Sequence, residues 1–275
     1  MHFNRFFEFK PENTNNLFII FRDRKVLYDL DQKTFLLNCS YLKFEDYSFE
    51  IIGIGKEDDM NIYSVDISGH PFPLKEQGYL SLVEYEIRHL FPMLTPYDIS
   101  VLGRANQLMH WIKSNKHCGY CGSIKTFSES EEALFCKCNN IMVYPTISPC
   151  VLALIYKDSK ILLARNSLFP EGLFSALAGF IEVSETAEEC VEREVFEEVS
   201  LKVKNVKYFG SQSWPFPSQL MLAYTCEYES GEINVDGKEI VEADWYDLDN
   251  LPSTPPNSTL SGTLINSYVS DHLKP

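Results

Sequence analysis

Short apolar runs separated by polar turns mark the first part of the chain. Asp, Asn, Gly and Pro bound these runs, and such a pattern predicts β-strands; the predicted strands are residues 17–21, 49–54 and 61–67. Residues 77–116 are predicted to be largely helical, with a break at 91–96. Within that range, a helix is expected to open at Gly103-Arg104 and to lead into the next element.

From residue 146 the runs become longer and more apolar. The predicted strands are residues 150–156, 160–164, 173–178, 207–210, 220–228 and 243–248. An Ala- and Glu-rich stretch without Gly or Pro predicts a helix from about residue 185, and a second helix is expected near residues 261–272. Strands combined with two helices predict an α+β fold built as an α/β/α sandwich, preceded by a mixed α/β N-terminal domain.

Composition narrows the possible functions. The 275 residues are 45% hydrophobic, which is enough for packed cores, and carry a net charge of −15. Such a chain repels polyanions, so sequence-independent binding to nucleic acid or to acidic membranes is not expected. No apolar run approaches the roughly 18 residues of a membrane span, and the charged start does not resemble a signal peptide. We therefore expect a soluble cytoplasmic protein.

One stretch carries an unusual density of acid. Residues 182–198 hold eight glutamates in seventeen positions, with Arg193 as the only base. In a helix, Glu194 and Glu198 share one face, with Glu197 beside them. A solvated acidic face is the alternative interpretation. The crowding of like charges favours a divalent cation instead, and carboxylate oxygens suit Mg²⁺ or Mn²⁺.

Four cysteines form a second candidate site. Cys118 and Cys121 are followed after fourteen residues by Cys136 and Cys138. Two cysteine pairs that flank a short hairpin predict a structural zinc ribbon, and disulfides are the weaker alternative in a reducing compartment. The second pair is spaced by one residue, where ribbons normally have two, so the usual fourth position would be Asn139. The other cysteines, Cys150 among them, are expected in the core.

The acidic stretch also resembles a known motif. Gly179, Glu185 and the run Arg193-Glu194-Val195-Phe196-Glu197-Glu198 have the spacing of the Nudix hydrolase signature. The resemblance implies a loop–helix–loop that binds metal ions and cleaves a nucleoside diphosphate linked to another group. Arg193 is expected to pair with Glu185. Ser200 stands where the family has Gly, and a left-handed residue other than Gly there costs roughly 1 kcal/mol.

A second stretch points to one branch of this family. Ser211-Gln-Ser-Trp-Pro-Phe-Pro-Ser-Gln219 resembles the SQPWPFPxS motif of the NADH pyrophosphatase branch, which contributes to substrate selection. Ser213 replaces a proline, and Ser218-Gln219 replaces the final x-Ser. Pro215 and Pro217 are expected to hold the backbone extended and to project Trp214 and Phe216. The alternative is a hydrophobic loop packed on the sheet.

The resemblance implies roles for individual residues. Glu194, Glu198, Glu239 and the carbonyl of Ala178 would hold Mg²⁺ or Mn²⁺, with Glu242 a weaker candidate. Glu198 or Glu197 would be the general base. Substrate contacts are implied for Glu131, Tyr144, Phe180, Gln212, Ser213, Trp214, Pro215, Phe216, Pro217, Ser218, Gln219 and Ser261.

The implied activity is hydrolysis of NAD(H) to NMN(H) and AMP by a cytoplasmic homodimer, with NAD-capped RNA as a further substrate. One alternative is the same chemistry on another nucleotide, such as ADP-ribose. Another is a non-catalytic zinc-ribbon module that binds nucleic acid or a partner protein. The expected organisation is an N-terminal domain over residues 1–112, the ribbon over 113–145 and the Nudix domain over 146–275.

Overall fold

The computed structural model describes residues 16–38, 50–57, 60–70, 81–128, 131–138, 140–235 and 237–273. The chain divides into two compact units. The first comprises Met1–Thr146 together with Pro215–Pro217, and the second comprises Ile147–Trp214 and Ser218–Pro275. The three-part division expected from the sequence stays a prediction.

A six-stranded mixed sheet forms the centre of the first unit. Its order is β4-β5-β1-β2-β6, with β3 added to β1. Only the β1–β5 pair is parallel. The strands are β1 (Asn16–Arg22), β2 (Lys25–Asp29), β3 (Leu37–Asn38), β4 (Glu50–Glu57), β5 (Met60–Asp66) and β6 (Leu82–Glu86). The three strands predicted from the sequence are confirmed, except that Phe49 lies outside the described residues.

The predicted helix over residues 77–116 is partly wrong. Its described part begins with the strand β6, which pairs with β2, and continues with α1 (Ile87–Leu90), η3 (Phe91–Met93) and α2 (Pro96–Asn115). α2 begins at Pro96 rather than at Gly103, because Thr95 caps it and forms a capping box with Asp98. Residues 77–80 lie outside the described part.

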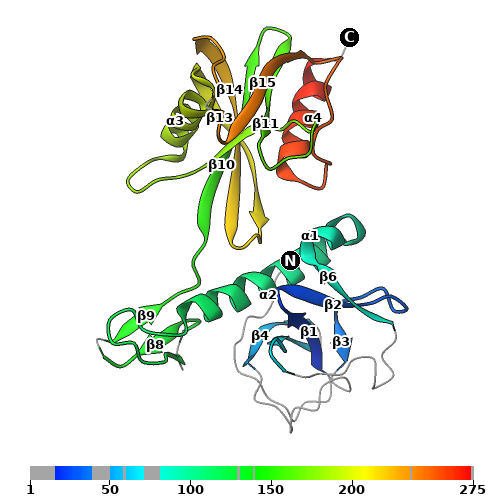
Figure 1. The fold of residues 1–275 in the computed structure, drawn as a ribbon, viewed down its shortest axis with the longest axis vertical. Coiled ribbons are helices and arrows are strands. Elements are labelled where there is room, and N and C mark those ends of the chain that lie inside the picture. Colours follow the sequence, from blue (N-terminus) through cyan, green and yellow to red (C-terminus); the bar gives the residue numbers. More distant parts are fainter. Residues whose placement is uncertain are drawn as a thin grey trace. The chain divides into compact units, whose positions relative to one another are not determined.

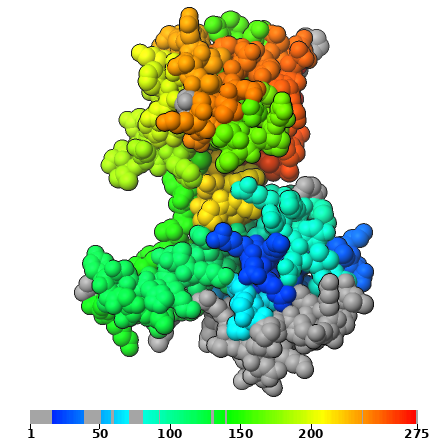
Figure 2. Space-filling model, viewed as in Figure 1, coloured from blue at the N-terminus to red at the C-terminus, as the bar shows by residue number. Residues whose placement is uncertain are grey.

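The cysteine-bearing segment follows α2 directly in the chain. Figure 2 shows the green residues of this part of the first unit gathered in one lobe. It is a three-stranded antiparallel sheet of β7 (Thr126–Phe127), β8 (Leu134–Cys136) and β9 (Ile141–Val143). The β8–β9 connection contains Asn140, whose φ of 52° is left-handed. A hairpin of this kind is what the cysteine spacing predicts.

The second unit is a sheet between two helices. Figure 1 shows α3 and α4 on opposite sides of a sheet with the order β13-β14-β10-β11-β15, to which β12 is added along β10. The elements are β10 (Ser148–Lys157), β11 (Lys160–Asn166), β12 (Leu177–Phe180), α3 (Ala187–Val199), β13 (Lys202–Trp214), β14 (Gln219–Ser230), β15 (Ile240–Asp247) and α4 (Leu260–His272).

The side chains of β10 show how this sandwich is held together. Val151, Ala153 and Ile155 pack with the buried residues of α3, whereas Leu152 and Leu154 pack with those of α4. A strand that is apolar on both faces reads as a continuous apolar run, as residues 150–156 do. The predicted α+β sandwich is confirmed.

Three details of the second unit differ from the expectations. The strand predicted over residues 173–178 is β12, at Leu177–Phe180. The strand predicted over 207–210 is part of the longer β13, and the remaining predicted elements are confirmed. Residues 215–218 form the turn between β13 and β14 and are not extended, because two long antiparallel strands must reverse direction there. Among the described helices, none is both long and apolar enough to cross a bilayer.

The end of α3 confirms the left-handed residue predicted at Ser200. Its φ is 60° and ψ is 25°, and its amide donates to the Phe196 carbonyl. Replacing Ser200 with Gly relieves the steric cost of this conformation, so we expect an increase in the free energy of unfolding of about 0.5–1 kcal/mol. Thermal unfolding measures it. Ser200→Ala keeps the Cβ and loses the hydroxyl bond to the Asn234 carbonyl, so that control should not be stabilised.

Candidate active site

Local hydrogen bonds fix the entry to α3. The Thr186 side chain accepts from the Glu189 amide, and Glu189 accepts from the Thr186 amide, which completes a capping box. One turn earlier, Glu185 accepts a hydrogen bond from the Glu182 amide at 3.0 Å. The loop therefore enters the helix in one defined path.

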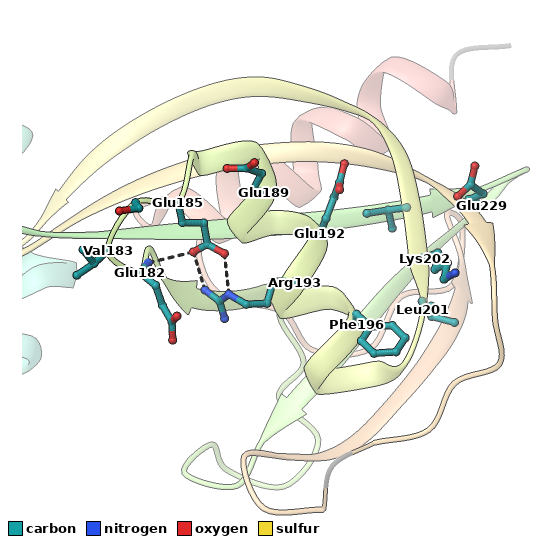
Figure 3. A pocket seen from close by; sticks show the side chains of 12 residues that line it. Glu182, Val183, Glu185, Glu189, Glu192, Arg193, Phe196, Leu201, Lys202 and Glu229 are labelled. Atoms are coloured by element: carbon teal, nitrogen blue, oxygen red, sulfur yellow. Dashed lines mark hydrogen bonds and ion pairs between the residues drawn. The ribbon is translucent and has the colours of Figure 1, made fainter.

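Arg193 ties this loop to the helix. Its guanidinium donates to both oxygens of Glu185, at 2.7 and 2.8 Å, as Figure 3 shows. It also donates to Glu194 at 2.8 Å, to Glu197 at 3.0 Å and to the Phe180 carbonyl at 2.9 Å. The predicted pairing of Arg193 with Glu185 is confirmed. The Arg193 guanidinium thus contacts three carboxylates, and it also binds the end of β12 through the Phe180 carbonyl.

The Glu185–Arg193 pair makes the free energy of unfolding depend on pH in the acidic range. Hydrogen bonds from Arg193 lower the pKa of Glu185 from 4.5 to about 2. The folded state therefore binds this proton less readily than the unfolded state, so the stabilisation is present above pH 4.5 and is lost as pH falls towards 2. We expect the unfolding free energy of the wild type to fall more steeply over this window than that of Glu185→Gln. Denaturant titrations at several pH values measure the two slopes, and equal slopes would contradict the assignment.

Glu194 and Glu198 lie on the side of α3 that faces the sheet. Glu198 is 5% exposed, and the Glu194 side chain is 14% exposed. Burial raises the pKa of Glu194, and the charge of Arg193 opposes that shift. Gly179 makes room for Glu194, since a Cβ at Gly179 would lie 1.8 Å from the Glu194 carboxyl carbon. The motif therefore needs glycine at position 179 because the Glu194 carboxylate approaches its Cα closely. The backbone there does not have a left-handed φ, so conformation is not the reason.

The three predicted carboxylate ligands lie within electrostatic range of Cys150. Burial, together with the charges of Glu194, Glu198 and Glu239, raises the pKa of the Cys150 thiol to about 12. Glu239 also contributes to the raised pKa of Glu194. In the described part of the chain, only the four cysteines form a group with ligand atoms all within 4.8 Å, so the carboxylates are more widely spread.

Cys150 was predicted only as a core residue. It is indeed buried, on β10 opposite Phe180 of β12. Its place beside the carboxylates comes from that strand pairing, and no sequence spacing signals it.

The remaining candidates around the carboxylates have different surroundings. Ala178 lies on β12, opposite Leu152 of β10. Glu197 is 58% exposed on its side chain and is held by Arg193. Glu242 accepts from Arg165 Nε at 3.0 Å, so it is engaged in an ion pair away from α3. Of the two base candidates, Glu198 is the buried one.

A cavity of about 720 Å³ is lined by one side of α3, the loop before it, and residues of β13 and β14. Its helix residues are Glu189, Glu192, Arg193 and Phe196, which form one stripe at helical spacing (Figure 3). Glu194 and Glu198 do not line it. The converging carboxylates, rather than this cavity, therefore mark the candidate catalytic centre.

The four cysteines come together despite their irregular spacing. The Sγ atoms of Cys118 and Cys138 are 3.6 Å apart, as are those of Cys121 and Cys136, and the Cys136–Cys138 distance is 3.4 Å. A tetrahedral ion with bonds of about 2.3 Å to sulfur needs edges of about 3.8 Å. Asn139 lies outside the described residues. The cluster fits a four-thiolate metal site with Cys138 as the fourth ligand.

The residues implied in substrate binding are divided between the two units. In the first, the Tyr144 hydroxyl donates to Glu131, and the Tyr144 ring is 49% exposed. In the second, Phe180 is 51% exposed at the end of β12. Ser261 is buried, with its hydroxyl 2.7 Å from that of Ser175, so it faces the interior.

The Gln212 side chain forms hydrogen bonds within the second unit. Its amide donates to the Ser258 carbonyl and accepts from the Leu260 amide, at 3.0 and 2.8 Å. These bonds join β13 to the start of α4. On β13, Ser213 is exposed and Trp214 is partly buried, whereas Ser218 and Gln219 are partly buried where β14 begins. The side-chain amide of Gln212 thus has a structural role.

The turn residues Pro215–Pro217 belong to the first unit. Phe216 packs edge-on against Phe91, with ring centroids 5.1 Å apart, and Arg88 lies 4.8 Å above the Phe216 ring. Pro215 is buried, and its carbonyl accepts from Asn106 at 2.7 Å. Phe216 is thus packed, as the alternative interpretation expected, against the core of the first unit, which includes residues of its sheet.

Comparison with known proteins shows which family model and which relatives this chain resembles. Residues 146–264 match the model of the NUDIX domain. A protein of Pseudomonas syringae pv. syringae named NAD-capped RNA hydrolase NudC is 44% identical over 171 residues, which are 62% of each chain. One of the same name from Escherichia coli is 47% identical over 167 residues, 61% of this chain and 65% of its own.

The match therefore spans less than two thirds of the length of these relatives. Among solved structures, a NUDIX hydrolase from Nitrosomonas europaea has a TM-score of 0.49 and 21% identity, and it covers 57% of this chain and 92% of its own. The Nudix resemblance drawn from the motif is confirmed by the family model, which residues 146–264 match.

Proposed function

We propose that this protein hydrolyses the diphosphate of NAD(H) to NMN(H) and AMP and also removes NAD caps from RNA. The observation that carries the proposal is the placement of Glu194 and Glu198, both largely buried, on one side of α3. Gly179 leaves room for Glu194, and Glu239 lies within electrostatic range of it, in a segment that matches the NUDIX domain model. The relatives named NAD-capped RNA hydrolase support the choice of substrate.

The residues present fit a divalent cation. Glu194 and Glu198 are half-buried and buried carboxylates on one helix face, and Glu239 adds a third from the loop before β15. Together with the Ala178 carbonyl they would hold Mg²⁺ or Mn²⁺, which neutralises diphosphate oxygens and lowers the pKa of a bound water. Glu198 then accepts the proton of the attacking water, because Glu197 is held by Arg193 at the exposed side.

Zinc is the proposed ion of the cysteine cluster. The sulfur separations of 3.4–3.6 Å suit a tetrahedral thiolate site with a structural role. Hydrogen bonds from Ser123 lower the pKa of Cys121 to about 6, so this thiol deprotonates readily for metal binding. Metal analysis of the purified protein should find about one zinc per chain, and Cys138→Ser should lower that content.

Several further features belong to the same proposal. Glu131, Tyr144 and Phe180 are partly exposed groups, of which the two rings suit flat nicotinamide and adenine rings. Trp214 would contribute in the same way. A homodimer in the cytoplasm, and the division at residues 1–112, 113–145 and 146–275, are proposed from the family resemblance.

Product analysis tests the proposed function. The full chain is incubated with Mg²⁺ or Mn²⁺ and with NADH or ADP-ribose, and products are separated by chromatography. We expect NMNH and AMP from NADH, formed faster than AMP from ADP-ribose. Faster turnover of ADP-ribose than of NADH would contradict the assignment of NAD(H) as the preferred substrate. A protein that hydrolyses neither compound with either ion would overturn the enzymatic one.

A further inference from the structure

A cavity in the first unit is lined by none of the three predicted metal-binding carboxylates. Its volume is about 800 Å³, within the range of small-molecule sites. Three segments surround most of it: the β1–β2 turn, the start of α1 and the C-terminal half of α2. The two-residue turn has left-handed φ values of 49° at Asp23 and 67° at Arg24, and both residues line the cavity.

Four cations and three carboxylates belong to the lining of this cavity. Arg24, Lys25 and Arg88 are exposed, and no carboxylate among the described residues forms an ion pair with any of them. A fourth cation, Lys113, is paired with Asp66. The other acidic side chains are Asp23 and Glu86, and the remaining polar ones are Asn106, His110 and Ser114. In a chain of net charge −15, this is a local reversal of sign.

The rest of the lining is apolar. Phe21, Ile87 and Met109 are buried in the core of the unit. Phe216 lines the cavity beside Arg88, whose guanidinium lies 4.8 Å from the ring centroid. Arginine that rests on an aromatic ring keeps its donors free for a phosphate, and its flat face can stack on a base.

We propose that this cavity binds a small organic phosphate with a flat apolar body, of the size of a mononucleotide. Arg24, Lys25 and Arg88 bind the phosphate by charge-assisted hydrogen bonds. Phe216 and the buried apolar side chains receive the ring. The site is separate from the proposed hydrolysis, and its occupancy does not depend on the metal carboxylates.

Calorimetric titration with AMP tests this site. All proteins carry Glu194→Gln and Glu198→Gln, which remove the metal-binding carboxylates of the other unit. Arg24→Gln/Lys25→Gln should weaken AMP binding about 10-fold, from loss of two phosphate contacts. Lys33→Gln/Lys56→Gln removes two exposed cations of the same unit that do not line the cavity, and should change the affinity less than about 2-fold.

Two further comparisons complete the test. Adenosine, which lacks the phosphate, should bind at least about 10-fold more weakly than AMP, and Arg88→Glu should abolish AMP binding. Equal affinities of the cavity variant and its control, or equal affinities for adenosine and AMP, would overturn the site. A single-stranded oligonucleotide that binds while AMP does not would identify a nucleic-acid surface and would also overturn it.

Discussion

Replacing Glu198 with Gln should lower the turnover of NADH at least about 10³-fold, which corresponds to about 4 kcal/mol of transition-state stabilisation. Glu198 is 5% exposed, and its charge acts on Cys150 as do those of Glu194 and Glu239. The substitution keeps the shape of the side chain and removes its negative charge. Metal binding and proton acceptance are therefore lost together, whereas packing is kept. Steady-state kinetics with saturating Mn²⁺ and circular dichroism measure the two effects.

A matched control comes from the outer face of the same helix. Glu192 is an exposed glutamate in a cavity that neither Glu194 nor Glu198 lines, and Glu192→Gln should leave turnover within about 3-fold of wild type. If Glu198→Gln retained wild-type turnover, the catalytic assignment would be wrong. If both variants lost activity equally, general acidity of the helix rather than one carboxylate would be responsible.

Gly179→Ala should reduce NADH turnover about 10²-fold or more with little loss of stability. A Cβ at this position would lie 1.8 Å from the Glu194 carboxyl carbon and 2.0 Å from Oε1. The obstructed atoms are the end of a flexible side chain, so Glu194 can rotate away and the backbone can stay. One predicted metal ligand is then displaced. Kinetics at increasing Mn²⁺ concentration should show a raised metal requirement.

Gly210→Ala provides the comparison for a glycine in the same sheet. The only atom near an added Cβ there is Leu260 Cδ1, at 3.9 Å, which is ordinary contact. Its turnover and metal requirement should match the wild type. A Gly179→Ala protein with the same metal requirement as Gly210→Ala would show that Glu194 does not bind the catalytic ion.

Features governed by neighbours along the chain were predictable from the sequence. The α3 helix begins where Thr186 and Glu189 form a capping box and ends at a left-handed Ser200, and both signals lie within a few residues. The Glu185–Arg193 pair follows from the motif spacing. The strands of the second unit were predictable because their apolar runs are long and bounded by turns.

Features governed by distant partners were not predictable. The segment Leu82–Glu86 became a strand because it pairs with β2, more than fifty residues earlier. Cys150 reached the carboxylates through the pairing of β10 with β12. Phe216 packed against Phe91 and Arg88, although its motif alone left both packing and projection open.

The sequence by itself determined the helix α3, its caps, the cysteine hairpin and the match of residues 146–264 to the NUDIX domain model. Only the tertiary structure decided that Cys138 joins the cluster, that Gly179 makes room for Glu194, and that exposed cations line a cavity of the first unit. The physical reason is the distance along the chain over which each interaction acts. Caps and helical spacing act over a few residues, whereas these three arrangements depend on atoms that the chain brings together from separate segments.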